Sequence, residues 1–199
     1  MARDRAARRP EAKPLRLFVA VELPGPVKDA VEEAFAPWRE LFPKARWVPR
    51  EHWHITLKFL GRTWPRLVDW VPKQVEAAAG DVESFRTRVT GVGRFPPSGN
   101  AHVLWAGLED EDGRMSGLAA NIEGGLLDEF PPEKRAFHPH LTVARSDPPV
   151  KVPPEFGETP LLTEEWEVDH VVLLRSHLRR PAPLYEPLAR FPLGAGRPR

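Results

Sequence analysis

Apolar and polar positions repeat with two periods along this chain, and the two periods predict strands and helices. Between His54 and Phe59, apolar residues alternate with polar ones, which is the two-residue period of a β-strand. Strands are predicted over residues 16–23, 47–48, 54–61, 83–95, 102–107, 138–144, 166–174 and 185–191. Apolar residues at helical spacing predict helices over residues 26–42, 65–80 and 115–129.

The order of these elements predicts the fold class. Strands and helices alternate at first, and a strand pair, a helix and further strands follow. This order favours an α+β fold with mostly antiparallel sheets. Pro37 should kink or end the first helix, and Gly61 should close the strand that begins at His54. Residues 96–100 predict a hairpin turn, and the proline-rich stretch Asp147 to Pro160 predicts an exposed loop.

Composition narrows the class of protein. The 199 residues are 41% hydrophobic and 29% charged, as in soluble globular proteins, and they include no cysteine. Disulfides, thiolate catalysis and cysteine-based zinc sites are therefore excluded, and the cytoplasm is the expected compartment. No apolar run has the length of a membrane span. We expect one bilobal domain over residues 15–193, a flexible basic tail over 1–14 and a second flexible tail over 194–199.

The net charge of +1 gives no overall basic field that would indicate a nucleic-acid binder. The charge is nevertheless uneven, because the first thirteen residues carry five basic side chains against two acidic ones. Two interpretations remain open for the tails: they contact phosphate backbones, or they are solvated segments without a partner.

One short phrase occurs twice and carries the candidate chemistry. Residues 52–57 and residues 138–143 both follow the pattern His-x-His-apolar-Thr-apolar, and both lie on predicted strands. The inner histidines, His54 and His140, are 86 positions apart. We therefore expect two duplicated lobes related by a pseudo-twofold axis.

Alternation on a strand places each histidine on the same face as the threonine two positions later. His54 and Thr56 share one face, as do His140 and Thr142, and the apolar residues between them face a core. Two facing imidazoles can act as general acid and general base, since the ring titrates near neutral pH. The threonine hydroxyls can donate hydrogen bonds to phosphate oxygens. The pattern thus suits hydrolysis of a cyclic phosphodiester without a metal or other cofactor.

With these motifs the chain resembles the 2H phosphoesterases, and among them the RNA 2′,3′-cyclic phosphodiesterases, also described as 2′–5′ RNA ligases. The resemblance covers nearly all of residues 15–193. Its blocks are residues 16–20, 47–61, 91–95, 103–107, 137–145, 173–176 and 185–193.

The resemblance implies roles for individual residues. His54 would be the proton donor and His140 the proton acceptor, although the near-symmetric repeat does not by itself distinguish the roles. Arg145 would bind phosphate, which requires the strand to end or bulge near Ala144. Phe59 and Tyr185 are further candidate substrate contacts.

The resemblance also implies a substrate, a product and a minor reaction. The substrates would be RNA with 2′,3′-cyclic phosphate termini, tRNA fragments among the candidates, and small 2′,3′-cyclic nucleotides. The products would be 2′-phosphomonoester ends, and 2′–5′ RNA ligation would be a minor activity. Because the cleft would be built within one chain, we expect a monomer with no obligate protein partner and no membrane contact.

Two alternatives remain. The two His-x-His segments, which include His52 and His138, could assemble a four-histidine metal site for a metal-dependent phosphoesterase. Alternatively, the protein is a non-catalytic module that binds RNA ends through stacking aromatic residues. The candidates for stacking are Trp47, Trp53, Phe95 and Tyr185. In the enzymatic interpretation, His52 and His138 are either structural or part of the rim of the site, since they share the face of the inner histidines.

Overall fold

The computed structural model describes residues 13–179 and 183–194, so most of both predicted tails lies outside the described residues. The strands are β1 (Leu15–Glu22), β2 (Arg46–Trp47), β3 (His54–Thr63), β4 (Phe85–Thr87), β5 (Val89–Phe95), β6 (Ala101–Leu108), β7 (His140–Val150), β8 (Trp166–Val168), β9 (His170–His177) and β10 (Leu184–Pro192). The helices are α1 (Gly25–Leu41), α2 (Trp70–Gly80) and α3 (Arg114–Gly125), with 3₁₀ turns η1 (Arg50–His52), η2 (Pro65–Leu67) and η3 (Pro154–Glu158). The named strand pairs are antiparallel, which confirms the α+β class.

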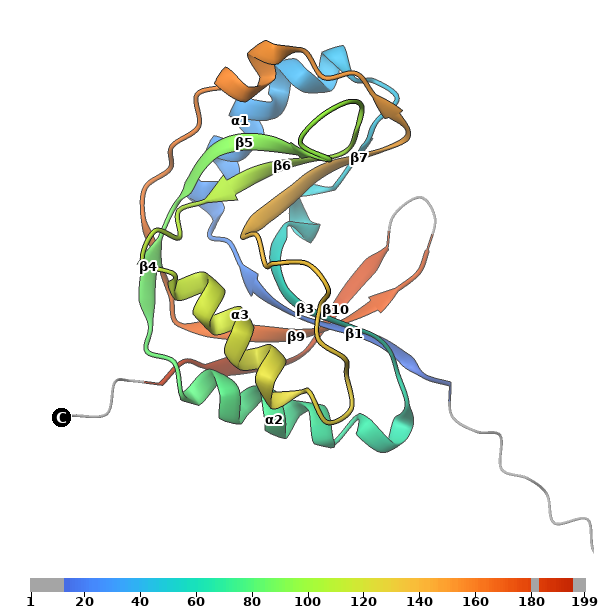
Figure 1. The fold of residues 1–199 in the computed structure, drawn as a ribbon, viewed down its shortest axis with the longest axis vertical. Helices are drawn as coiled ribbons and strands as arrows, with labels where there is room; N and C mark the ends of the chain where they lie inside the picture. The colour runs from blue at the N-terminus through green and yellow to red at the C-terminus, as the bar shows by residue number, and fades with distance from the viewer. Residues whose placement is uncertain (1–12, 180–182, 195–199) are drawn as a thin grey trace, which may run out of the picture.

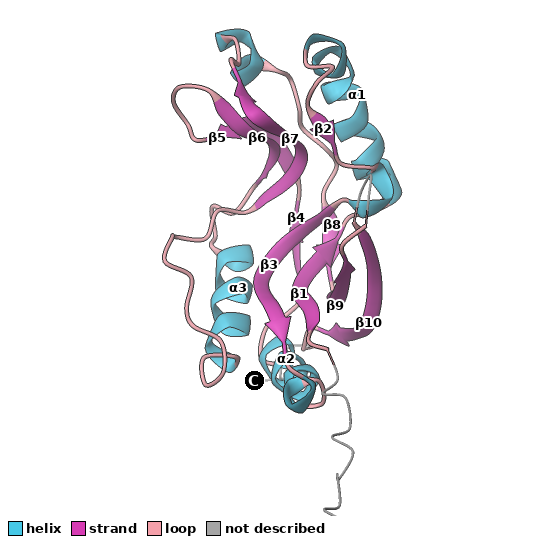
Figure 2. Cartoon of the chain, turned by 90° about the vertical axis from the view of Figure 1, so that its right-hand side faces the viewer, coloured by secondary structure: helices cyan, strands magenta, loops and turns pink. Residues whose placement is uncertain are grey.

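The main sheet divides into two lobes. Its strands follow the order β10-β9-β1-β3-β7-β6-β5, and β2 also pairs with β7. Between β3 and β7 the only register pair is Ile55 with Leu141, so the sheet is nearly interrupted there. The first lobe contains β1, β3, β9 and β10, and the second lobe contains β2, β5, β6 and β7 (Figures 1 and 2).

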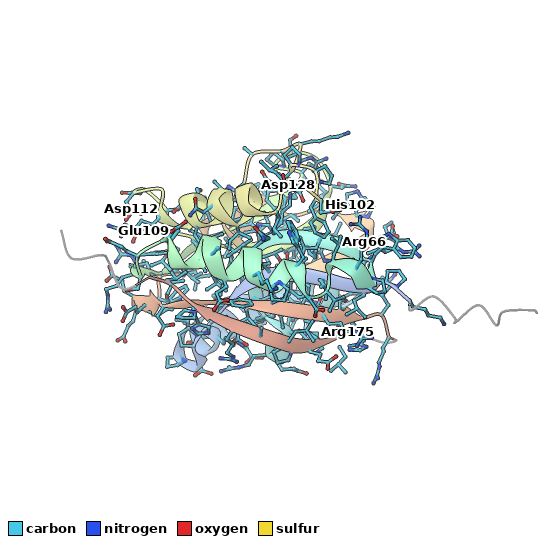
Figure 3. The ribbon with its side chains drawn as sticks, turned by 90° about the horizontal axis from the view of Figure 1, so that it is seen from below. Arg66, His102, Glu109, Asp112, Asp128 and Arg175 are labelled. Atoms are coloured by element: carbon cyan, nitrogen blue, oxygen red, sulfur yellow. The ribbon has the colours of Figure 1, made fainter. Side chains whose placement is uncertain are left out.

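The helices tie the lobes together by crossing between them. Helix α1 follows β1 of the first lobe but lies against the second lobe, where Phe35 packs on Trp47 and Phe156. Helix α3 follows β6 of the second lobe but packs against β3 of the first, side by side with α2 (Figures 1 and 3). Each lobe is therefore covered by a segment that leaves the other lobe.

Strand β1 is buried on both faces, which explains its nearly continuous apolar sequence. One face joins the main core through Leu17, Val19 and Val21. The other face forms a second, smaller cluster of four buried residues, Phe18, Ala20, Val172 and Leu174, with Tyr185 packed against it. This smaller cluster supports one wall of the candidate site.

Tertiary context carries helix α1 and strand β7 past prolines. Helix α1 does not end at Pro37 but runs on to Leu41. A proline costs the helix one backbone hydrogen bond, and the neighbouring Trp38 offsets this by packing on Phe156 of η3. The predicted loop from Asp147 to Pro160 also begins inside β7, which extends to Val150. Pro148 and Pro149 fall in an irregular part of the ladder with β6, where no register partner requires their missing N–H.

Each of the two long strands predicted from the sequence is divided into two shorter strands, which belong to different sheets. Residues 83–95 form β4 and β5, and residues 166–174 form β8 and β9. Strands β4 and β8 pair with each other in a separate two-stranded sheet. Single residues, Arg88 and Asp169, separate the halves, so the local apolar pattern carries no sign of the division.

Three element boundaries also differ from prediction. Strand β3 continues through Gly61, which adopts a φ of 60° at an irregularity opposite β1, so this glycine marks a bulge and not an end. The second helix begins at Trp70 after the short turn η2 at Pro65, and the third ends at Gly125.

Candidate active site between the two lobes

The two repeated motifs meet where the lobes join. His54 is the first residue of β3, and His140 is the first residue of β7. The residues that follow them, Ile55 and Leu141, are fully buried and form the register pair between the two strands. The antiparallel pairing relates the two strands by a local twofold axis, as the duplicated pattern predicts. Both histidines are half-buried, so neither ring is lost in the apolar core.

A β-bulge lies at the same place in both strands. Leu57 has no partner in the β1–β3 register, and Val143 has none in the β6–β7 register. A bulge reverses the alternation of side chains, so the residue two positions later turns to the face of the histidine. Phe59 and Arg145 occupy these positions, and both are exposed. The bulge near Ala144 on which the role of Arg145 depends is therefore present.

Each inner histidine is oriented by the backbone of the outer one. The Nδ1 atom of His54 lies 2.7 Å from the carbonyl oxygen of His52, and the Nδ1 atom of His140 lies 2.7 Å from that of His138. A carbonyl oxygen only accepts hydrogen bonds, so Nδ1 carries a proton whether the ring is neutral or charged. Nε2 of each ring is thereby left as the nitrogen that can gain or lose a proton. His52 and His138 thus have a structural contact to the inner histidines.

Aromatic residues of the first lobe pack around His54. The ring of Phe18 lies 4.8 Å from the imidazole, and the ring of Tyr185 lies 5.2 Å away at nearly a right angle. Phe59 packs on Phe18 at 5.7 Å and leaves 52% of its own surface exposed. Two of the predicted substrate contacts, Phe59 and Tyr185, therefore lie beside His54.

The second lobe surrounds His140 in a similar way. Phe95 lies 5.1 Å from the imidazole and Trp105 lies 6.2 Å away. Gly93 is opposite Trp105 in the β5–β6 ladder, and a Cβ at this position would stand 2.1 Å from the indole. Glycine is therefore required there so that the indole can lie across β5. Gly93 and Trp105 are site components that the sequence pattern did not single out.

Burial and positive charge both favour the neutral imidazoles. Desolvation, with the charges of Arg145, His52 and Lys28, lowers the pKa of His54 to about 4, against the opposing effect of its hydrogen bond to the His52 backbone. Desolvation also lowers the pKa of His140, with help from Arg145. Burial raises the pKa of the Tyr185 hydroxyl, against the opposing effect of Arg145. Arg145 therefore lies close enough to act on three groups contributed by both lobes.

Arg145 has a second arginine directly beside it. Arg46 of β2 is its register partner, while the adjacent pair, Trp47 and Ala144, packs toward the core. Within residues 13–179 and 183–194, no carboxylate lies within salt-bridge distance of either arginine. Like charges directly opposite on neighbouring strands destabilise a sheet. An anion between or beside the two guanidinium groups would remove that repulsion.

The structure gives less support to a metal site and to a module that binds RNA only through stacking aromatic residues. In the described part of the chain, no three His, Asp or Glu side chains gather closely enough to hold a metal ion. Trp53 is only 2% exposed and belongs to the core, so it is not available to stack on a base. Trp47 is half-buried against Phe35. Phe95 is half-buried beside His140.

Comparison with known proteins identifies the family. Residues 27–180, which include both motifs, match the model of the 2′-5′ RNA ligase superfamily. The chain belongs to the 2′-5′ RNA ligase superfamily. It is 36% identical over 189 residues to a Thermus thermophilus protein named RNA 2′,3′-cyclic phosphodiesterase, covering 90% of each chain.

Solved structures show the same fold. The crystal structure of TT0787 from Thermus thermophilus has a TM-score of 0.80 and 31% identity, and the match covers 92% of this chain and 100% of that one. E. coli LigT complexed with 3′-AMP has a TM-score of 0.68 and 26% identity, covering 91% and 99%. In this member of the superfamily, no helix of the described residues is long and apolar enough to cross a membrane.

Proposed function

We propose that this protein hydrolyses the 2′,3′-cyclic phosphodiester ends of RNA and of small nucleotides to 2′-phosphomonoesters. The single observation that carries the proposal is the paired placement of His54 and His140 at the lobe junction. In each ring Nδ1 is hydrogen-bonded to a backbone carbonyl oxygen, so Nε2 is the nitrogen that would exchange a proton with the substrate. The relatives named RNA 2′,3′-cyclic phosphodiesterase support the same substrate class.

The proposed reaction is an in-line displacement at phosphorus. His140 accepts a proton from water at Nε2 while the water oxygen attacks phosphorus. The bond from phosphorus to the 3′ oxygen breaks, and His54 donates its Nε2 proton to that oxygen. The product carries a 2′-phosphate and a 3′-hydroxyl, and exchange with solvent returns both rings to their starting protonation states.

Four side chains would hold the phosphate during this step. The hydroxyls of Thr56 and Thr142 donate to its non-bridging oxygens, and the guanidinium groups of Arg145 and Arg46 balance its charge. The role of His54 as donor requires a charged ring, whereas its pKa in the free protein is about 4. The negative charge of the bound phosphodiester would raise that pKa, so binding itself would prepare the acid.

Turnover of adenosine 2′,3′-cyclic phosphate in the presence of EDTA tests the proposal. The expected result is adenosine 2′-phosphate, formed at the same rate with and without chelator. Loss of activity in EDTA would favour the four-histidine metal site. Binding without turnover would favour the RNA-end binding module, and adenosine 3′-phosphate as product would reverse the assigned leaving group.

We further propose that the enzyme acts as a cytoplasmic monomer on RNA fragments, with tRNA fragments among the candidate substrates. All residues of the proposed mechanism come from one chain, which supports the monomer. Size-exclusion chromatography with light scattering tests the oligomeric state. A minor 2′–5′ ligation, in which a 5′-hydroxyl takes the place of water as the nucleophile and the same bond to the 3′ oxygen breaks, remains part of the proposal.

A further inference from the structure

A second pair of facing arginines lies on the first lobe. Arg16 of β1 and Arg62 of β3 are register partners, and both are exposed. Cross-strand partners share a face of the sheet, and Arg16 lies two positions from Phe18, which contacts His54. Both arginines therefore point to the face that carries the candidate active site.

Among the arginines that the structure describes, most have an acidic partner, but these two have none. Within the described chain, no carboxylate lies within salt-bridge distance of Arg16 or Arg62. Eight other arginines do contact a carboxylate, namely Arg39, Arg50, Arg66, Arg86, Arg88, Arg114, Arg175 and Arg190. Two unneutralised like charges directly opposite each other reduce stability, so their presence suggests an external anion.

Exposed aromatic residues alternate with these charges. Phe59 is 52% exposed and pairs with Phe18, and Trp64 is 47% exposed. The guanidinium carbon of Arg62 lies 5.9 Å from the centre of the Trp64 ring. Phe59 and Arg62 are three residues apart on β3, so they are separated by roughly 10 Å. Cations interleaved with exposed rings are the recognition pattern of single-stranded nucleic acid.

The arrangement is continuous with the active site. Tyr185, which contacts His54, lies close enough to both Arg145 and Arg16 for each charge to lower the pKa of its hydroxyl. The positive field therefore extends from Arg145 past Tyr185 to the outer ends of β1 and β3. A small cyclic nucleotide held at His54 would not reach that end of the sheet.

We propose that Arg16, Phe59, Arg62 and Trp64, here called the outer strip, bind the RNA strand on the 5′ side of the cyclic phosphate. This inference rests on the proposed function and adds its substrate preference. Phe59 stacks on the terminal base, Trp64 stacks on a base further upstream, and the two arginines contact upstream phosphates. The enzyme therefore prefers an RNA end to a free cyclic nucleotide.

The experiment compares kcat/KM for two substrates with the same terminal base, adenosine 2′,3′-cyclic phosphate and UUUA ending in a 2′,3′-cyclic phosphate. The variants are Arg62→Gln and the double variant Arg16→Gln/Arg62→Gln. The matched control is Arg114→Gln, which removes the same charge beside Asp112. Figure 3 shows Asp112 and Glu109 at the end of the molecule opposite Arg175, and Arg175 is paired with Leu17 next to Arg16.

We expect wild type and the Arg114→Gln control to favour the oligonucleotide, and the double variant to lose most of this preference. Loss of two phosphate contacts to a single strand should make the slope of log kcat/KM against log salt shallower by about 1.4 for the oligonucleotide. The inference is overturned if wild type treats both substrates equally, or if the double variant keeps the wild-type ratio and salt slope. Absence of turnover on both substrates would instead overturn the proposed function.

Discussion

Strands β3 and β7 share one backbone plan but present different side chains after the bulge. Both begin with histidine, carry threonine two positions later and bulge at the next residue. Their first seven positions also have the same pattern of burial. The bulge turns an exposed aromatic ring, Phe59, toward the site on one strand and an exposed cation, Arg145, on the other. In the proposed mechanism, duplication supplies matched proton-transfer groups, and the position after the bulge divides substrate binding between the lobes.

The environments of the two histidines also differ. Around His54, Phe18 and Tyr185 approach closely, and burial lowers its pKa to about 4. Burial also lowers the pKa of His140, but by less than it lowers the pKa of His54. Identical motifs therefore have unequal affinities for a proton. In the free protein the difference runs against the proposed roles, because His54, the proposed acid, has the more strongly lowered pKa, so that the proposal depends on the bound phosphodiester to charge it.

The largest expected effect comes from removing either histidine. His54→Ala and His140→Ala should each reduce kcat on adenosine 2′,3′-cyclic phosphate by about 10²–10⁴-fold, because each loses one proton-transfer group. The double variant should be little worse than either single one, since the two rings act as a unit. His102→Ala, which removes a histidine of β6, is the control. Full activity in either single variant would show that the two repeats are not equivalent partners in catalysis.

Strands β3 and β7 also differ at the position directly before Phe59 and Arg145. Lys58 is 2% exposed on β3, where β7 has the small Ala144. Its Nζ lies 2.5 Å from a carboxylate oxygen of Glu123 on α3 and donates to the carbonyl of Pro131. This contact holds α3 and the segment leading toward His140 against the first lobe.

Glu123→Ala should lower the free energy of unfolding by at most about 3–5 kcal/mol, because it leaves the buried ammonium with only the Pro131 carbonyl and the more distant carboxylate of Glu133. Lys58→Met should cost less, since it replaces the charge by an apolar side chain of similar length and leaves Glu123 free to reach solvent. Urea denaturation of both variants measures the difference. A smaller loss for Glu123→Ala than for Lys58→Met would contradict the buried ion pair as the cause.

The sequence was sufficient to predict which motif residues share a face, because alternation on a strand is a local property. His54 with Thr56, and His140 with Thr142, follow from a two-residue period without knowledge of any neighbour. The same local rule places Phe59 on the wrong face. A bulge is defined by the pairing with the partner strand, and the residue types around Leu57 do not indicate one.

Features that depend on distant segments were missed for the same reason. Arg46 acquires its position beside Arg145 only when β2 pairs with β7, and Gly93 is needed only because Trp105 lies across it. Helix α1 continues through Pro37 because contacts with η3 offset the lost hydrogen bond. Each case requires two segments that are far apart in the sequence.

The unequal burial of the two histidines should also appear in stability. The folded pKa of His54 is about 4 and the unfolded value is about 6.5, so between these limits the unfolded chain binds more protons. The free energy of unfolding should therefore rise with pH across this window and fall on acidification, by about 3 kcal/mol at most. The groups that face His54 and keep it neutral are Arg145, Lys28 and His52, with Tyr185 uncharged beside them.

Urea denaturation of wild type, His54→Gln and His140→Gln at several pH values between about 4 and 7 measures this dependence. His54→Gln should flatten the profile more than His140→Gln does. Equal slopes in the two variants would show that the repeats bury their histidines alike, against the difference described above.

The smallest expected effect tests the division of substrate binding after the bulge. Stacking of a base on an aromatic ring contributes about 1–3 kcal/mol, so Phe59→Leu should lower kcat/KM for adenosine 2′,3′-cyclic phosphate by roughly five- to a hundred-fold. The lower end is expected, because one side of the ring already packs on Phe18.

Hydrolysis of the base-free methyl riboside 2′,3′-cyclic phosphate should be unaffected, and Phe59→Trp should retain most activity on both substrates. Arg145→Met, in the equivalent position of β7, should impair both substrates to the same extent, because each presents the same phosphate. An equal loss on the base-free substrate in Phe59→Leu would mean that the ring supports His54 through Phe18 and does not bind the base.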